Sequence, residues 1–149
     1  MARLLAKKWL AAFPLLLSSV TFAGCGKDGP SRLDVWGTIT WKGQPIRSGV
    51  IFFEPNTTKG NKGPQGFALI KEGNFDSRYE RSKGCISGPH IATIQAGDGQ
   101  NITSGRPYGN SLFASHNLAI DIPPDGGEIN LQIPDSVPPA PKTTVEDVE

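Results

Sequence analysis

The stretch Val35–Pro55, VWGTITWKGQPIRSGVIFFEP, decides the fold class. In its first part apolar and polar residues alternate, and Val50–Glu54 near its end is rich in β-branched and aromatic residues. Both patterns are typical of β-strands, and Lys42-Gly43 between them favours a tight turn because glycine tolerates a positive φ. The stretch therefore predicts two successive strands, Leu33–Trp41 and Val50–Glu54.

The remainder of the chain repeats this organisation at short intervals. Strand patterns recur every 8–20 residues, and no segment after the N-terminal leader has a sustained helical period. We expect further strands at Gly66–Lys71, at Phe75 continuing into a polar edge segment Asp76–Lys83, at His90–Ala96, and at Leu118–Ile122 and Glu128–Ile133, which Pro123–Gly127 would join as a hairpin. Asn56–Gln65 is expected to be an exposed loop, and Gly97–Asn117 a long loop that is either functional or contains a further strand. The chain is therefore expected to be all-β, with about seven strands forming a β-sandwich.

Length and charge limit the classes of function. The 149 residues suffice for one domain, and 15 Lys and Arg against 14 Asp and Glu give a net charge of +1. The charges form no long run of one sign. This balance excludes a nucleic-acid groove and a polybasic membrane patch, so we expect no nucleic-acid partner.

The N-terminus has the features of an export signal. Met1–Lys8 is basic, and Trp9–Ala23 is an uncharged, largely apolar stretch of 15 residues, shorter than the roughly 20 that span a bilayer. Thr21–Cys25 resembles the lipobox of bacterial lipoproteins, which implies a signal helix over residues 1–24 and lipid attachment at Cys25. Acyl chains such as palmitate on Cys25 would hold the protein stably on a membrane. The alternative is an ordinary signal peptide whose cleavage leaves Cys25 free.

The segments that follow the signal have distinct compositions. Residues 25–31 would form a short lipidated tether, 32–133 the β-sandwich domain, and 134–149 a Pro-rich acidic tail that we expect to be disordered or to adopt the polyproline II conformation. If Cys25 is acylated, Cys85 has no partner in the chain. It is then expected to be a small buried apolar residue, or alternatively an exposed thiol that links two chains.

A family resemblance covers roughly Leu33–Ile133. Val35–Pro55, the turn at Lys71–Phe75 and the segment Ser87–Ile94 resemble transthyretin-like, carboxypeptidase-regulatory-like domains, in particular those of exported lipoproteins from planctomycete-type bacteria. The resemblance implies a transthyretin-like (prealbumin-like) β-sandwich. Its motifs are structural, so it brings no catalytic residue with it.

A partner is expected to bind through the loops Asn56–Gln65 and Gly97–Asn117, and the candidate binding residues lie in the second loop. Tyr108 and Phe113 provide aromatic area for stacking against a ligand. His90 and His116 have no second ligand at metal-binding spacing, so neither a metal nor a cofactor is expected. We therefore expect a non-catalytic, membrane-anchored module of the cell envelope that binds a protein or glycan partner or helps to assemble a surface complex. Gly26 after Cys25 favours the outer membrane, with the domain facing the periplasm or the cell surface.

Two other functions remain open. The first is a periplasmic accessory protein for a small ligand or ion, since Asp121, Asp125 and Glu128 flank one turn, although without the spacing of a calcium loop. The second is a hydrolase of the transthyretin-related hydroxyisourate type. That family ends in Tyr-Arg-Gly-Ser, which this chain lacks, and Ser115-His116 has no aspartate placed by spacing to complete a triad.

Overall fold

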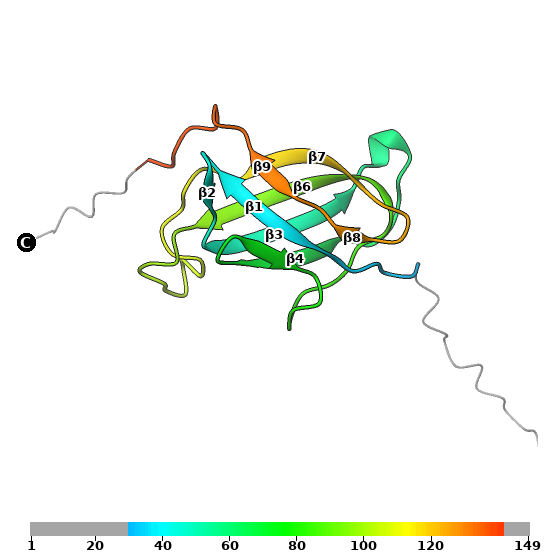
Figure 1. Ribbon diagram of the computed structural model, residues 1–149, viewed down its shortest axis with the longest axis horizontal. Helices are drawn as coiled ribbons and strands as arrows, with labels where there is room; N and C mark the ends of the chain where they lie inside the picture. The colour runs from blue at the N-terminus through cyan, green and yellow to red at the C-terminus, as the bar shows by residue number, and fades with distance from the viewer. Residues whose placement is uncertain (1–29, 142–149) are drawn as a thin grey trace, which may run out of the picture.

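The computed structural model describes residues 30–141, which form a curled β-sheet with long connecting loops (Figure 1). The strands are β1 Val35–Trp41, β2 Gln44–Pro45, β3 Ser48–Pro55, β4 Gly66–Lys71, β5 Asn74–Asp76, β6 Gly88–Gly97, β7 His116–Ile122, β8 Gly127–Glu128 and β9 Leu131–Ile133. Within the described residues the one helical element is the 3-10 turn η1, Thr57–Lys59. None of the helical structure in this range could cross a membrane.

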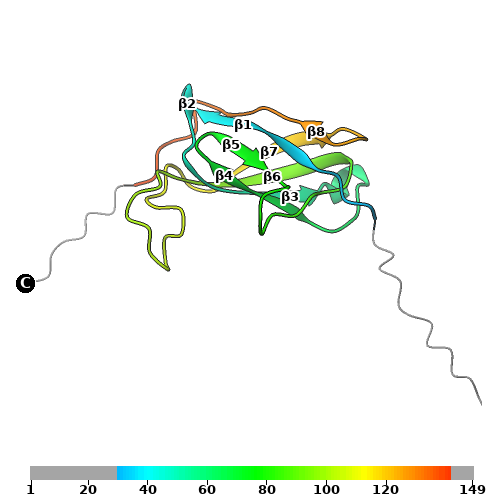
Figure 2. The ribbon, with the colours of Figure 1, turned by 60° about the horizontal axis from the view of Figure 1, so that its bottom comes forward.

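The sheet has the order β2-β1-β5-β4-β3-β6-β7, and neighbours along this path are antiparallel. β8 and β9 add to the other side of β1 in parallel. The sheet curls so that β1, β8 and β9 lie across β3 and β6, as Figures 1 and 2 show from two directions. The longest ladder joins β3 to β6 over eight pairs, from Ser48 opposite Gly97 to Pro55 opposite His90.

The core lies inside the curl and consists of the inward-facing residues of the strands. Alternate residues of a strand point to opposite faces, so Val35 and Ile39 of β1 face inward together, as do Ile51 and Phe53 of β3. The other large buried side chains are Ile46, Ile70, Phe75, Ile94, Phe113, Ile122, Leu131 and Ile133. The pattern of apolar residues thus specifies which face of each strand is buried.

The expectation of an all-β chain is confirmed. β1, β3, β4 and β6 match the expected strands, and residues 98–115 lie outside the named strands, as expected of a loop. Residues 30–141 contain nine strands rather than the expected seven, because the short strand β2 is additional and the expected last strand is split into β8 and β9. The signal helix and Cys25 fall outside the described residues.

The expected hairpin between Leu118–Ile122 and Glu128–Ile133 is wrong. β7 pairs with β6, whereas β8 and β9 cross to β1, where Leu131 lies opposite Ile39. Alternation of polar and apolar residues shows which side of a strand is buried but does not specify the partner strand. The turn that contains Pro123 therefore connects two separate parts of the sheet.

The polar segment after Phe75 also differs from expectation. The strand stops at Asp76 and is not an edge, because β5 pairs with β1 on one side and β4 on the other. Beyond Asp76 the chain forms turns, with an isolated bridge from Lys83 to Phe67. The charged residues Arg78, Glu80, Arg81 and Lys83 are exposed to solvent, and the buried Ser77 hydroxyl accepts a hydrogen bond from the Val35 N–H.

The expected disordered tail is wrong for residues 134–141. Val137 packs against the core, Pro139 forms a bridge with Phe113, and the Ala140 N–H donates to the Leu112 carbonyl at 2.9 Å. Residues 134–137 form a turn in which the Val137 N–H donates to the Pro134 carbonyl at 3.0 Å, and the prolines are tolerated because the backbone bonds of this segment use other donors. Residues 142–149 lie outside the described part of the chain.

Cys85 is buried, as the first of its two expected roles requires. It is 0% exposed, and burial raises the pKa of its thiol to about 11. Its backbone forms a bridge with Leu33, which continues the sheet beyond β1. In this setting the thiol is a packing group rather than a link to another chain.

Candidate functional site

The long loop after β6 is an ordered excursion of the chain. Its two arms run side by side, because the Asp98 N–H donates to the Asn110 carbonyl and the Gly99 N–H to the Tyr108 carbonyl, at 3.0 and 3.1 Å. Gly97 begins the loop, where a Cβ atom would lie 2.0 Å from the Tyr108 carbonyl oxygen. Only glycine allows the two arms to approach this closely.

Asp98 holds the arms together with its carboxylate. The carboxylate accepts the backbone N–H groups of Gln100 and Asn110 at 2.8 and 2.9 Å and the Asn110 side-chain amide at 3.0 Å. The Asn110 side-chain bond, together with the backbone N–H groups, lowers the pKa of Asp98 below its ordinary value. The loop therefore depends on an ionised group at its base.

Phe113 connects the loop to the body of the domain. It is 2% exposed, and its ring meets the Trp41 ring edge to face, with the ring centres 5.1 Å apart. The backbone of Phe113 forms a bridge with Pro139, and the neighbouring Ala140 N–H donates to the Leu112 carbonyl. Residues from β1, the loop and the C-terminal segment thus meet at one end of the domain.

The loop and the C-terminal segment enclose an open pocket of about 550 Å³, which we call the loop pocket. It is lined by Gln95, Ala96, Gly105, Arg106, Pro107, Tyr108, Gly109, Ser111, Phe113, Ala114, Ser115, Ala140 and Pro141. The structure brings the two expected binding residues, Tyr108 and Phe113, to this one pocket. Tyr108 is half-buried, and burial raises the pKa of its hydroxyl. The stacking role expected for Phe113 is wrong, because its ring is 2% exposed and packs against Trp41 in the core.

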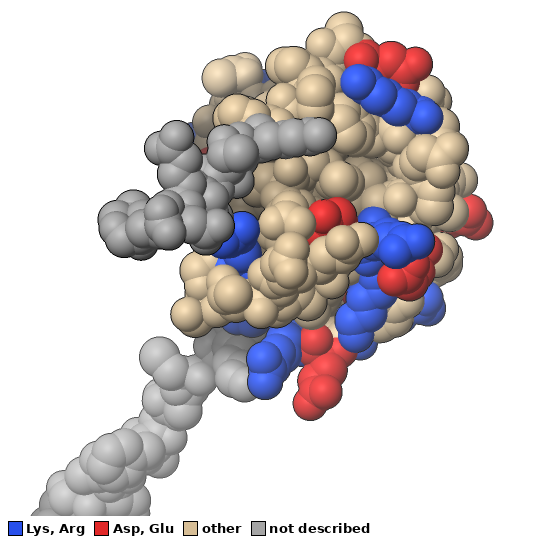
Figure 3. Space-filling model, turned by 90° about the vertical axis from the view of Figure 1, so that its left-hand side faces the viewer, with Lys and Arg blue, Asp and Glu red and all other residues tan. Residues whose placement is uncertain are grey.

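A second pocket of about 540 Å³ lies on the other side of the loop base, and we call it the turn pocket. It is lined by Trp41, Lys42, Gln44, Pro45, Ile46, Arg47, Asp98, Gln100 and Leu112. The Lys42 ammonium lies 4.7 Å from the centre of the Trp41 ring. Figure 3 views this end of the molecule, where charges of both signs lie beside one another on a mostly uncharged surface.

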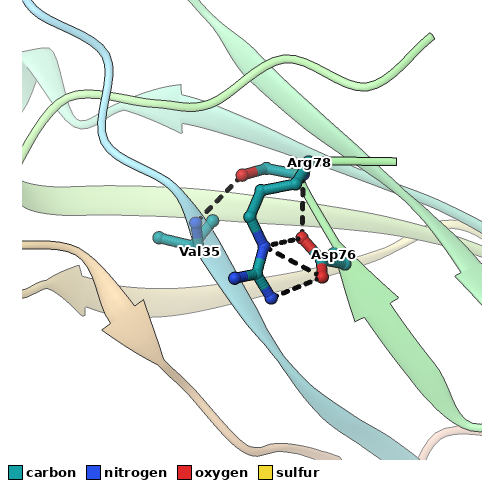
Figure 4. A network of polar contacts seen from close by, with 4 residues as sticks. Val35, Asp76 and Arg78 are labelled. Atoms are coloured by element: carbon teal, nitrogen blue, oxygen red, sulfur yellow. Dashed lines mark hydrogen bonds and ion pairs between the residues drawn. The ribbon is translucent and has the colours of Figure 1, made fainter. Parts of the chain in front are cut away.

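A third cluster, on the sheet near β5, has a structural role. The Arg78 guanidinium group donates three hydrogen bonds to the Asp76 carboxylate, two from Nε and one from Nη2 (Figure 4). Arg78 also lies over the Trp36 ring, 4.2 Å from its centre. The guanidinium lowers the pKa of Asp76. Next to it, the Val35 N–H donates to the buried Ser77 hydroxyl at 2.9 Å. These contacts hold the chain where β5 leaves the sheet.

The remaining candidate residues do not gather into a site. His90 is 0% exposed, with Nδ1 placed 2.8 Å from the Gly88 carbonyl. His116 begins β7 and Ser115 lines the loop pocket. Asp121 is at the end of β7, whereas Glu128 is in β8 beside β1. Within residues 30–141, no group of three His, Cys, Asp or Glu side chains could hold a metal ion.

Sequence reasoning missed Trp41, Asp98 and Ala140. Trp41 looked like an ordinary strand residue, although its place beside the Lys42-Gly43 turn was a signal that it lies at one end of the sheet. Asp98 precedes a glycine in a turn-rich loop, a position typical of a side chain that caps its own loop. Nothing in the sequence placed Ala140 beside Leu112.

Comparison with known proteins found no matching family model, no matching curated protein and no matching solved structure.

Proposed function

We propose that this chain is an exported, lipid-anchored, non-catalytic module of the cell envelope, built as a transthyretin-like β-sandwich, that binds an envelope protein or glycan in the pockets around the 97–115 loop. In this proposal Cys25 is acylated and becomes the first residue of the mature chain. From residue 25 to residue 30 is five residues, or at most about 18 Å of extended chain. The domain would therefore lie close to the membrane.

The observation that carries the proposal is the position of the pockets. The described chain enters at residue 30 at one end of the domain, and the 97–115 loop lies at the opposite end (Figures 1 and 2). Attachment through the N-terminal end therefore leaves both pockets open to a partner. Their volumes fall within the range of about 300–1,000 Å³ that is usual for ligand sites.

The chemistry of the pockets favours an uncharged or mixed polar partner. The loop pocket offers the phenol of Tyr108, the amide of Gln95, the guanidinium of Arg106 and the hydroxyl of Ser111 over an apolar floor. Such a combination suits the hydroxyl groups and ring faces of a glycan, or the backbone of a peptide. Arg106 is the one charged residue that lines the loop pocket, and the turn pocket has charges of both signs, so neither has the several positive charges that would select a polyanion.

The test has two parts. The intact mass of the protein from the membrane fraction of its host is expected to match a mature chain that starts at acylated Cys25, and a Cys25→Ala variant is expected to lose the lipid mass and leave the membrane. A photo-crosslinking amino acid at Tyr108 is expected to capture an envelope component, while the same group at Thr58, beyond the far end of β3, does not. A water-soluble product with a free thiol at Cys25, or equal capture at both positions, would contradict the proposal.

The second candidate is a small-ligand accessory protein, which the pocket volumes also favour. It predicts that a soluble envelope metabolite raises the melting temperature of the wild type but not of Tyr108→Ala. Loss of the shift in a variant of the far end, such as Thr58→Ala, would argue against it.

A further inference from the structure

β7 is a long open edge of the sheet. Within residues 30–141 it pairs only with β6, over seven consecutive positions from His116 opposite Ile94 to Ile122 opposite Gly88. The other strands that pair on one side only are short: β2 has two residues, β8 two and β9 three. An open strand edge presents unpaired backbone N–H and C=O groups that another strand can use.

The strand has few of the devices that protect such an edge. It contains no proline, lysine or arginine, and its unbroken register with β6 leaves no room for a bulge. Asp121 is its one charged residue. On the inner side, Leu118 and Ile120 pack against the core yet stay half-exposed, so the apolar layer continues to the edge of the sheet. A second strand added there would cover them.

The sequence of β7 is complementary to itself in the antiparallel sense. A two-fold axis at its midpoint, Ala119, pairs all seven residues and brings Ala119 opposite Ala119 of the second copy. On the inner face Leu118 then meets Ile120, and on the outer face Asn117 meets Asp121, whose carboxylate can accept from the amide. No like charges face each other, and the apolar layers of the two copies join.

From these observations we propose that the protein forms a two-fold homodimer in which the β7 strands of two copies pair antiparallel about Ala119 and join their sheets. Backbone hydrogen bonds between the two β7 strands would hold the dimer together, and the contacts between Leu118 of one copy and Ile120 of the other would bury further apolar surface. The proposal concerns the side of the sheet and does not depend on the lipid anchor or on the pockets.

Lysine substitutions test the dimer, because Asn117 and Ala119 are both exposed and on the same face of β7. Wild-type full-length chain purified from its host is expected to be dimeric by native mass spectrometry. Ala119→Lys places two ammonium groups opposite each other and is expected to raise the dimer dissociation constant roughly tenfold or more. The matched control, Asn117→Lys, places its ammonium opposite Asp121 and is expected to keep the dimer.

Cysteine trapping in the purified protein tests the register. Ala119→Cys is expected to form an intermolecular disulfide, because directly opposite Cβ atoms lie about 4.5–5.5 Å apart. Asp121→Cys is not expected to form one, because residue 121 lies opposite residue 117 of the second copy, four positions or about 13 Å along the strand from residue 121 of that copy. The chain without an added cysteine reports any bond through Cys25. The proposal would be overturned by a monomeric wild type, by equal effects of the two lysine substitutions, or by a crosslink at position 121 but not at 119. A monomeric wild type would mean that the β7 edge binds a different protein or no protein at all.

Discussion

Replacing Asp98 is expected to loosen the 97–115 loop, because three hydrogen bonds converge on its carboxylate. Bonds to a charged acceptor contribute about 1.5–3 kcal/mol each when buried, but Asp98 is half-exposed, so we take about 1 kcal/mol for each. Asp98→Ala is thus expected to lower the free energy of unfolding by about 3 kcal/mol. For a domain of this size that corresponds to a fall of about 10 °C in melting temperature.

Asp98→Asn separates charge from geometry. Its remaining oxygen can still accept the N–H groups of Gln100 and Asn110, so we expect a loss of about 1 kcal/mol. Because the folded protein lowers the pKa of Asp98 below 3.8, the stabilisation is complete above that pH and is lost as the pH falls through the lower folded value. The difference between wild type and Asp98→Asn is therefore expected to shrink in acid below pH 3.8.

Thermal unfolding followed by circular dichroism measures the global effect, and hydrogen exchange at the amides of Gln100 and Asn110 measures the local one. If the loop opens without the rest of the domain, the exchange protection falls more than the melting temperature does. Unchanged protection of both amides in Asp98→Ala, together with a stability within about 0.5 kcal/mol of wild type, would refute the role given to this carboxylate.

Three further predictions concern buried side chains. Phe113→Ala is expected to destabilise the domain by about 4 kcal/mol in urea unfolding, and Phe113→Leu by less than half as much, because only the first leaves a large cavity beside Trp41; equal losses would contradict the packing argument. Ser77→Ala is expected to cost about 1–3 kcal/mol, because it leaves the Val35 N–H without its partner, whereas Arg78→Ala is expected to lower the urea midpoint less, since half of the Arg78 side chain is exposed to solvent. Cys85 is expected to react with a thiol reagent only as fast as the protein unfolds, since it is buried and its pKa is about 11; rapid labelling of the folded protein would show that the thiol is accessible.

Local pattern was sufficient to predict the longer strands, wherever their partners lie in the chain. β3, β4 and β6 have dense β-branched or aromatic patterns bounded by glycine or proline, so their existence and their buried faces could be predicted. The pairing of β9 with β1 could not, because a three-residue strand satisfies its backbone equally well on many edges and only the finished core selects one.

The candidate site was predictable to the same extent. The 97–115 loop could be identified by its length and composition, and Tyr108 and Phe113 are its most prominent aromatic residues. The burial of Phe113 and the contribution of Trp41 depend on contacts between residues far apart in the chain. The ordering of residues 134–141 depends in the same way on a surface that exists only once the sheet has curled.

The parallel pairing of β1 with β8 and β9 has a consequence for the order in which the molecule is assembled. Thr38, in the first strand, is bonded to the Asn130 side chain, 92 residues later. Closing so long a segment is entropically expensive and makes folding slow. A chain that leaves a ribosome or a translocation pore with its N-terminus first cannot pair both sides of β1 until β8 and β9, near the end of the described residues, have emerged. Before that point it remains open, which is the state in which a polypeptide can still be threaded.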